Sequence, residues 1–254
     1  MIVKTEAIVL SAMYYRDTSK IVRLYTRQFG KISVIAKGAR DAKSKFRSAL
    51  EPMSYVTAVV YKNDNRELQL LSQCDSISNF YHLTEDMPKM YAAMSAVELV
   101  GVVTHDEEQN DRLFNLLLNH LHVVNSATKN EVVALYYFET QLADLLGLKP
   151  NLKDCSYCLK DLENVMAEQA RFTVLNEGVL CNECSATSPA RTISASSLRV
   201  MQRMQKVETV ESIMSLHLAP LEVDEIGRSL REHLTRHVEG FRGLRSEEVF
   251  GAIL

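Results

Sequence analysis

The first 80 residues alternate between apolar and polar side chains with the two-residue period of β-strands. In the stretch from residue 54 to 62, for example, Val56, Ala58 and Val60 share one face. The predicted strands cover residues 6–11, 21–26, 32–36, 54–62 and 67–72. Five short strands are too few for two well-covered sheets, and closing them into a barrel removes the exposed edges. We therefore predict a five-stranded OB-fold β-barrel over residues 1–80.

After residue 80 the apolar positions recur with the period of an α-helix. The predicted helices cover residues 87–103, 110–124, 128–147, 197–205, 209–216 and 223–238. Thr128 and Glu131 have the spacing of a capping box, and Gly147 followed by Pro150 is typical of a helix end. The pattern predicts an α+β multidomain chain. Its helical domain has a first part at residues 81–150 and a C-terminal part at 191–254, separated by a module at 151–190.

That module contains two identical Cys-x-x-Cys pairs, Cys155 with Cys158 and Cys181 with Cys184, separated by 22 residues. Each pair can present two thiolates from one tight turn, and four thiolates form a tetrahedral site for zinc or an Fe–S cluster. The alternative is two disulfides. The charged opening of the chain does not resemble a signal peptide, so we expect a reducing cytosol and one structural Zn²⁺. Four protein ligands leave no open position for catalysis. The fifth cysteine, Cys74, is expected to be a buried free thiol.

Charge is distributed unevenly, although the net charge is only −3. Residues 1–80 carry a balance of +6 and residues 81–254 a balance of −9. A basic small domain attached to an acidic body indicates a polyanionic partner for the first domain.

The stretch from residue 37 to 47 concentrates this positive charge in one predicted loop. OB-folds bind single strands with cations that follow the phosphates and aromatic rings that stack on bases. Phe46 could stack in this way, and Tyr14, Tyr15, Tyr25, Tyr55 and Tyr61 include further candidates. The alternative is a solvated basic loop without a ligand. The predicted DNA-binding residues are Lys37, Arg40, Lys43, Lys45 and Arg47, with Arg16, Lys20 and Arg23 from the same domain.

No catalytic motif is present in the sequence. There is no phosphate-binding glycine loop, no nucleophile elbow and no conspicuous pair of carboxylates. His233 and His237 are four residues apart, but the HExxH motif requires a glutamate where Leu234 stands. We expect these histidines on a solvated helix face beside a Glu232–Arg236 pair. The sequence therefore argues against an enzyme.

Several segments together resemble the RecO family of bacterial DNA repair proteins. They are residues 5–10, 15–20, 29–31, 37–40 and 145–150, and the paired cysteines with Gly178 ahead of Cys181. The resemblance implies an OB domain, a helical body with a zinc module, and no catalytic site. Leu159 and Glu177 stand where the family often has glycine.

The resemblance also implies a function in recombinational repair in the cytoplasm, at the nucleoid. Members bind single- and double-stranded DNA, anneal complementary strands and help load RecA onto DNA covered by single-strand-binding protein. They work with RecR and often with RecF. Two other classes fit the zinc ribbon: an NAD-dependent deacylase, for which the glycine-rich turn is missing, and an RNA-binding or transcription-associated protein. An OB-fold accepts RNA or DNA, so only the resemblance separates an RNA-binding or transcription-associated protein from a DNA-binding repair protein.

Overall fold

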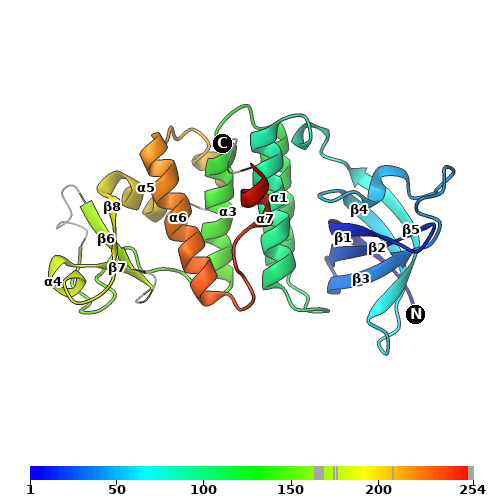
Figure 1. The fold of residues 1–254 in the computed structure, drawn as a ribbon, viewed down its shortest axis with the longest axis horizontal. Helices are drawn as coiled ribbons and strands as arrows, with labels where there is room; N and C mark the ends of the chain where they lie inside the picture. Colours follow the sequence, from blue (N-terminus) through cyan, green and yellow to red (C-terminus); the bar gives the residue numbers. More distant parts are fainter. Residues whose placement is uncertain (163–168, 174, 176, 208, 251–254) are drawn as a thin grey trace. The chain divides into compact units, whose positions relative to one another are not determined.

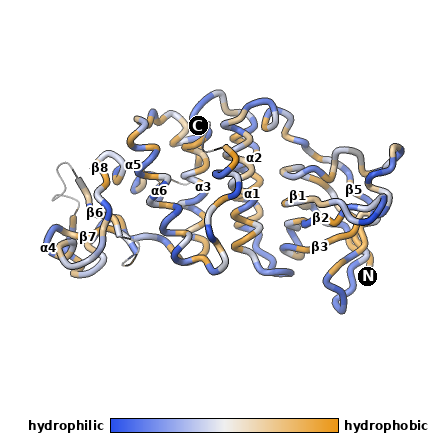
Figure 2. The backbone as a smooth tube through the Cα atoms, viewed as in Figure 1, coloured by the Kyte–Doolittle hydropathy of each residue, from blue (hydrophilic) through white to orange (hydrophobic). Residues whose placement is uncertain are grey.

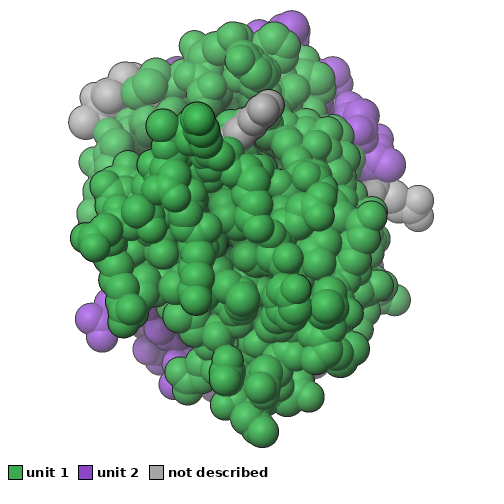
Figure 3. Space-filling model, turned by 90° about the vertical axis from the view of Figure 1, so that its right-hand side faces the viewer, with its two compact units in different colours: residues 1–127, 244–254 green, residues 128–243 purple. Residues whose placement is uncertain are grey.

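The computed structural model describes residues 1–162, 169–173, 175, 177–207 and 209–250, without the side chains of Arg47 and Gln169. The chain forms two compact units, coloured separately in Figure 3. Unit 1 consists of Met1–Ala127 together with Leu244–Leu254, and unit 2 of Thr128–Gly243. The division into four parts at residues 80, 150 and 190 stays a prediction.

Unit 1 begins with the predicted five-stranded barrel (Figure 1). Its strands close in the order β1-β2-β3-β5-β4, with β3 and β5 parallel and the other pairs antiparallel. This arrangement confirms the OB-type barrel. Its strands are β1 (Ile2–Tyr15), β2 (Ser19–Thr26), β3 (Gly30–Ala36), β4 (Tyr55–Tyr61) and β5 (Leu68–Ser78).

The barrel core is built from the inward positions of the strands, and Figure 2 shows hydrophobic and hydrophilic residues alternating along them. Leu24, Val34 and Val56 are completely buried. The segment after β3 also contributes. Phe46, directly before the turn η1 (Arg47–Leu50), and Leu50 at its end each retain only 1% exposure and belong to the same cluster. The prediction that Phe46 stacks on a base is therefore wrong, since the ring fills the barrel.

Four further elements complete unit 1: η2 (Tyr81–Leu83), α1 (Met87–Val103), α2 (Asp111–Ser126) and α7 (Arg245–Phe250). Lys31 of the barrel contacts the end of α1. Its buried ammonium donates to the carbonyls of Gly101 at 2.9 Å and of Thr104, directly after the helix, at 2.5 Å. Gly30 permits this approach, because a Cβ there would lie 2.1 Å from the Glu108 carbonyl oxygen. Among the helices in the described ranges, none combines the length and the apolar character that a membrane span requires.

Unit 2 packs three helices together: α3 (Glu131–Leu145), α5 (Ala195–Lys206) and α6 (Pro220–His237). A small antiparallel sheet of order β7-β6-β8 accompanies them, built from β6 (Gln169–Thr173), β7 (Gly178–Leu180) and β8 (Arg191–Ser194). β6 and β7 form an antiparallel hairpin, in which Phe172 lies opposite Val179. The short helix α4 (Asn182–Ser185) and the turn η3 (Val210–Ser212) are the remaining elements.

Four local predictions in unit 2 are wrong. Asn130, not Thr128, precedes α3, and it adopts a left-handed conformation without a side-chain cap. The stretch at residues 209–216 contains the single turn η3 instead of a helix, and Glu232 pairs with Arg191 instead of Arg236. His233 is not solvated: it is 1% exposed, and its Nε2 lies 2.6 Å from the Leu148 carbonyl oxygen.

Candidate metal centre and nucleic-acid interface

The first cysteine pair lies on a turn that is hydrogen-bonded to β7. The backbone N–H of Ser156 donates to the carbonyl of Val179 at 2.8 Å, and that of Val179 donates to Asn151 at 3.0 Å. Gly178 is required at this contact, because a Cβ there would lie 2.0 Å from the Asn151 carbonyl oxygen. Since β7 runs directly into Cys181, these bonds hold the two cysteine pairs next to each other.

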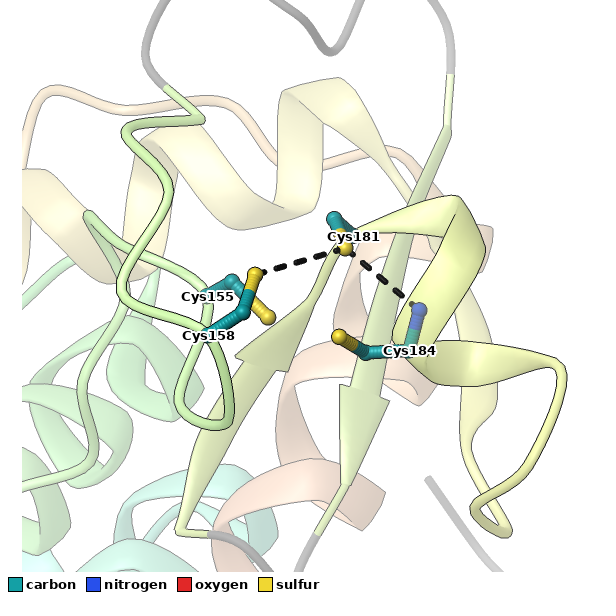
Figure 4. A group of neighbouring side chains, drawn as sticks. All are labelled: Cys155, Cys158, Cys181 and Cys184. Carbon is teal, nitrogen blue, oxygen red and sulfur yellow. Dashed lines mark hydrogen bonds between the residues drawn. The ribbon is translucent and has the colours of Figure 1, made fainter.

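The four sulfur atoms form one cluster, in which all of them lie within 4.8 Å of one another. Figure 4 shows the two pairs facing each other, with the Cys158 and Cys181 sulfurs 3.8 Å apart. A tetrahedral site with Zn–S bonds of about 2.3 Å has sulfurs about 3.8 Å apart, so the cluster fits a metal ion closely. All five cysteines of the chain are described as free thiols, so the disulfide alternative does not apply to this structure. The predicted group of ligands is brought together, and it could hold a metal ion.

The backbone around Cys155 favours its thiolate. Burial would raise the pKa of Cys155, but N–H donors of Cys158, Cys181 and Tyr157 lower it to about 6. A thiolate is the form that binds a metal. Cys74 in the barrel is the opposite case, because it is 3% exposed and burial raises its pKa to about 12. This agrees with the expected inert, buried thiol.

Two residues beside the cluster have left-handed backbones, Leu159 with φ 61° and Glu177 with φ 56°. They are the two positions where the sequence departs from the glycines of the RecO pattern. A side chain with a Cβ is disfavoured in this region by roughly 1–2 kcal/mol. The folded module therefore carries local strain on both sides of the metal centre.

The predicted DNA-binding residues lie on the barrel surface. Lys37, Arg40, Lys43, Lys45, Arg16 and Arg23 are exposed, and Lys20 is half-buried in an ion pair with Glu51 at 2.9 Å. The side chain of Arg47 lies outside the described part of the chain. Lys45 bonds to the Ser72 carbonyl at 2.5 Å, and Arg23 lies further along β2, opposite Ser33 of β3.

Arg40 connects the loop after β3 to the turn between β1 and β2. Its guanidinium donates to the carbonyls of Arg16 at 3.2 Å and Asp17 at 3.0 Å. The same guanidinium lies 4.3 Å from the ring centre of Tyr14, and the Lys20 ammonium lies 5.9 Å from it. Tyr14 is 73% exposed. The structure thus places the Lys20 and Arg40 cations beside one exposed ring, and we call these three residues the Tyr14 surface. The Arg16 guanidinium lies 5.2 Å from the ring centre of the neighbouring Tyr15.

The sequence did not single out Tyr14 among the five tyrosines. Tyr25, another of them, is completely buried and stacks on Phe114 with ring centres 6.0 Å apart. The available signal was position: Tyr14 stands at the end of β1 next to the basic turn, where the inward and outward alternation stops. An exposed ring beside two cations can contact both bases and phosphates.

Comparison with known proteins decides which family the chain belongs to. The family model described as recombination protein O N terminal matches residues 1–80, and the model described as recombination protein O C terminal matches residues 84–247. The chain belongs to the RecO family. Proteins named DNA repair protein RecO are similar over nearly the entire chain. The one from Chloroherpeton thalassium is 32% identical and covers 100% of both chains. The one from Alkaliphilus metalliredigens is 31% identical over 94% of this chain and 95% of its own.

The boundary between the two RecO models falls at the end of the barrel. The N-terminal model covers the five strands, and the C-terminal model covers the helices and the four cysteines. The Tyr14 surface and the metal centre therefore lie in different RecO domains.

Proposed function

We propose that this chain is a non-enzymatic mediator of recombinational DNA repair. It binds single- and double-stranded DNA, anneals complementary strands and, with RecR and in some cases RecF, helps load RecA onto DNA covered by single-strand-binding protein. It acts in the bacterial cytoplasm at the nucleoid. The observation that supports this best is the RecO match over both domains, together with an exposed basic surface on an OB-type barrel.

The Tyr14 surface and the loop at residues 37–47 provide the chemistry for DNA binding. Their cations neutralise phosphates, and the Tyr14 ring stacks on a base with about 1–3 kcal/mol. Annealing needs charge neutralisation and strand alignment, while base pairing supplies the free energy. No nucleotide hydrolysis is required, so annealing should proceed without ATP.

The metal in this proposal is one structural Zn²⁺ held by Cys155, Cys158, Cys181 and Cys184. Four thiolates suit zinc, and the spacing of the sulfurs supports a tetrahedral ion. When bound, the ion links the two cysteine turns and takes no part in a reaction.

The salt dependence of DNA binding tests the location of the nucleic-acid surface. Each phosphate contact to single-stranded DNA contributes about −0.7 to the slope of log K against log salt. A variant with alanine in place of Lys37, Arg40, Lys43 and Lys45 should weaken binding to all sequences alike. If about three of these residues contact phosphate, the slope should become shallower by roughly 2.

The matched control removes the same charge from unit 2, with alanine in place of Lys149, Lys153, Lys160 and Lys206. It should leave the slope unchanged. Replacing Tyr14 by leucine should weaken binding, whereas phenylalanine should preserve it, because only the ring is needed for stacking. The opposite result, an unchanged barrel variant and a weakened control, would place DNA on unit 2. Strand annealing that requires ATP hydrolysis by the purified chain would contradict the non-enzymatic assignment.

A further inference from the structure

Arg40, from the loop after β3, donates to three successive carbonyls of the turn between β1 and β2. Its backbone N–H donates to Thr18 at 2.9 Å, and Nη1 of its guanidinium donates to Asp17 at 3.0 Å and to Arg16 at 3.2 Å. Hydrogen bonds from a charged donor are stronger than those between neutral groups. Arg16 has φ 52°, a left-handed backbone that is disfavoured for a residue with a Cβ. Arg40 therefore stabilises a turn conformation that the turn residues alone disfavour.

This turn determines where the Tyr14 ring lies. Tyr14 pairs with Lys20 across the hairpin of β1 and β2, so the ring stands directly beside the turn. The Arg40 guanidinium also lies over the ring, 4.3 Å from its centre. The same group thus holds the turn by hydrogen bonds and the ring by a cation–π contact. Tyr14 is nevertheless 73% exposed, so most of the side chain is accessible to a ligand.

Contacts that restrict the ring reduce the cost of binding to it. An exposed tyrosine without neighbours exchanges between rotamers, and a ligand that stacks on it must offset the entropy of fixing one of them. The Lys20 ammonium is the more distant of the two cations, at 5.9 Å from the ring centre, and it forms an ion pair with Glu51. Arg40 is therefore the closer contact and the one that orients the ring.

Single-stranded and duplex DNA present phosphates alike but present their bases differently. In a duplex each base is paired and stacked, so a ring can stack on it only after the base has been extruded, which costs free energy. Single strands offer unpaired bases, on which aromatic side chains stack directly. The charges of Arg40 and the lysines therefore contribute to the binding of both forms, whereas an oriented ring contributes to single strands.

We propose that the contact between Arg40 and Tyr14 sets a preference for single-stranded over duplex DNA. Tyr14 stacks on an unpaired base, and Arg40 is the positioning residue that orients its ring. The proposal rests on the proposed function, because it requires DNA at the Tyr14 surface. A guanidinium suits this role, since its plane lies on a ring while its N–H groups reach carbonyls. A lysine ammonium has the same charge but no plane.

The test uses fluorescence anisotropy with a labelled strand of about 20 nucleotides without self-complementarity, alone and as a duplex with its complement. Arg40→Lys and Tyr14→Leu should each weaken single-strand binding at least about fivefold, the lower limit for stacking of one base, and duplex binding less than about twofold. Tyr14→Phe keeps the ring and should bind both forms as the original chain does. Lys43→Ala is the charge control, because Lys43 is exposed in the same loop, and it should weaken both forms by the same factor.

A double-mutant cycle tests whether Arg40 acts through the ring. In the Tyr14→Leu background, Arg40→Lys should cause no further loss of single-strand affinity, because the ring that Arg40 orients is gone. If the two losses multiply instead, Arg40 contacts DNA independently of Tyr14 and the proposal is overturned. The variants should keep the melting temperature of the original chain. If Arg40→Lys lowers it, Tyr14→Leu decides alone, since it changes only an exposed side chain: equal losses for strand and duplex overturn the proposal.

The charge control separates this proposal from the proposed function. Lys43→Ala could weaken both forms of DNA while Arg40→Lys or Tyr14→Leu changes the ratio of the two affinities by less than about twofold. DNA then binds at this surface, and only the preference for single strands is wrongly assigned. If none of the variants changes either affinity, DNA binds elsewhere, and the proposed DNA surface fails together with the role of Arg40. A loss specific to single strands in both variants, without a further loss when they are combined, supports the proposal.

Discussion

The barrel at residues 1–80 and the cysteine module at residues 151–190 are stabilised by different means. The barrel encloses one continuous cluster of buried side chains contributed by all five strands and by the turn η1. Among its described residues, the module buries a few apolar side chains outside its cysteines, including Leu152, Leu162, Phe172 and Val179. Its most concentrated feature is the group of four sulfurs within 4.8 Å of one another.

This difference shows which groups stabilise each region. A segment of about 40 residues, such as the module, rarely buries enough apolar area to offset the loss of conformational entropy. In the barrel, many positions each contribute a moderate amount, so no single side chain is indispensable. In the module, the four sulfur atoms and the Zn²⁺ that we propose they bind would take that role, so stability should depend on each ligand. The following predictions test this contrast.

Removing the metal should have the largest effect. Structural zinc contributes on the order of 10 kcal/mol to the folding of a small module. Chelation, Cys155→Ser or Cys181→Ser should abolish hydrogen-exchange protection of the Ser156 and Val179 amides, while the barrel amides remain protected. Metal analysis measures the zinc content, and hydrogen-exchange mass spectrometry measures the protection of the module and barrel amides. Cys74→Ser is the control, since this buried thiol lies in the barrel and the metal content should stay at about one zinc per chain. If the module amides stay protected from exchange in metal-free protein, the module does not depend on the metal, and the proposed difference between the two regions is wrong.

A core truncation in the barrel should have a smaller, local effect. Leu24 is completely buried, and replacing such a leucine by alanine destabilises by about 2–5 kcal/mol. Leu24→Ala should lower the urea midpoint of the barrel while the zinc content stays unchanged. Ile77→Ala, on the outer side of β5, should change stability by less than about 0.5 kcal/mol. Loss of metal in Leu24→Ala would show that the two regions do not depend on separate sources of stability.

The pH dependence of unit 2 should be smaller again. Burial lowers the pKa of His233, while the Leu148 carbonyl and Glu177 partly oppose this and His237 adds to it. The folded state therefore keeps His233 neutral below pH 6.5, where the unfolded chain binds a proton. Stability contributed by the neutral ring is present above about pH 6.5 and decreases as the pH falls, by at most about 1.4 kcal/mol per pH unit.

Urea unfolding of unit 2 between pH 7.5 and 5.5 measures this effect. His233→Gln should flatten the profile, because glutamine can donate to Leu148 without titrating. His217→Gln replaces an exposed histidine of the same unit and should leave the profile as it is. Equal slopes in the original chain and His233→Gln would exclude His233 as the source.

The elements that the sequence predicted best are those in which one short-range pattern dominates. The cysteine spacing was sufficient to predict that the four sulfurs form one cluster. Alternation was sufficient for the barrel strands to within a few residues, apart from β1 and β5. β1 is longer than predicted because it pairs with β4 through its first half and with β2 through its second. Ala7, Ile8, Val9 and Leu10 are consequently all buried, which interrupts the alternation.

The errors arose where a distant partner decides the environment. Phe46 stands in a basic stretch, and only the folding of the loop back onto the barrel shows that its ring fills the core. His233 has charged neighbours in sequence, but it shares a buried face of α6 with Ile226 and Leu230 and meets Leu148 from another segment. Tyr14 became distinct from the other tyrosines when Arg40 and Lys20 were found beside it. Such contacts have no signature in local periodicity.

The smallest expected effect concerns the strained turn of the module. Leu159 has φ 61°, and relieving a left-handed backbone should gain about 1–2 kcal/mol, partly offset by the greater unfolded-state entropy of glycine, about 0.5–1 kcal/mol. Leu159→Gly should therefore stabilise the zinc-loaded module by about 0.5–1 kcal/mol, measured by thermal unfolding at saturating metal. Leu159→Ala removes the same exposed side chain but keeps the Cβ, so it should give no gain. If both variants stabilise equally, the exposed leucine side chain rather than its backbone is the source. A gain seen only with glycine shows that the left-handed backbone at Leu159, and not its side chain, lowers the stability of the module.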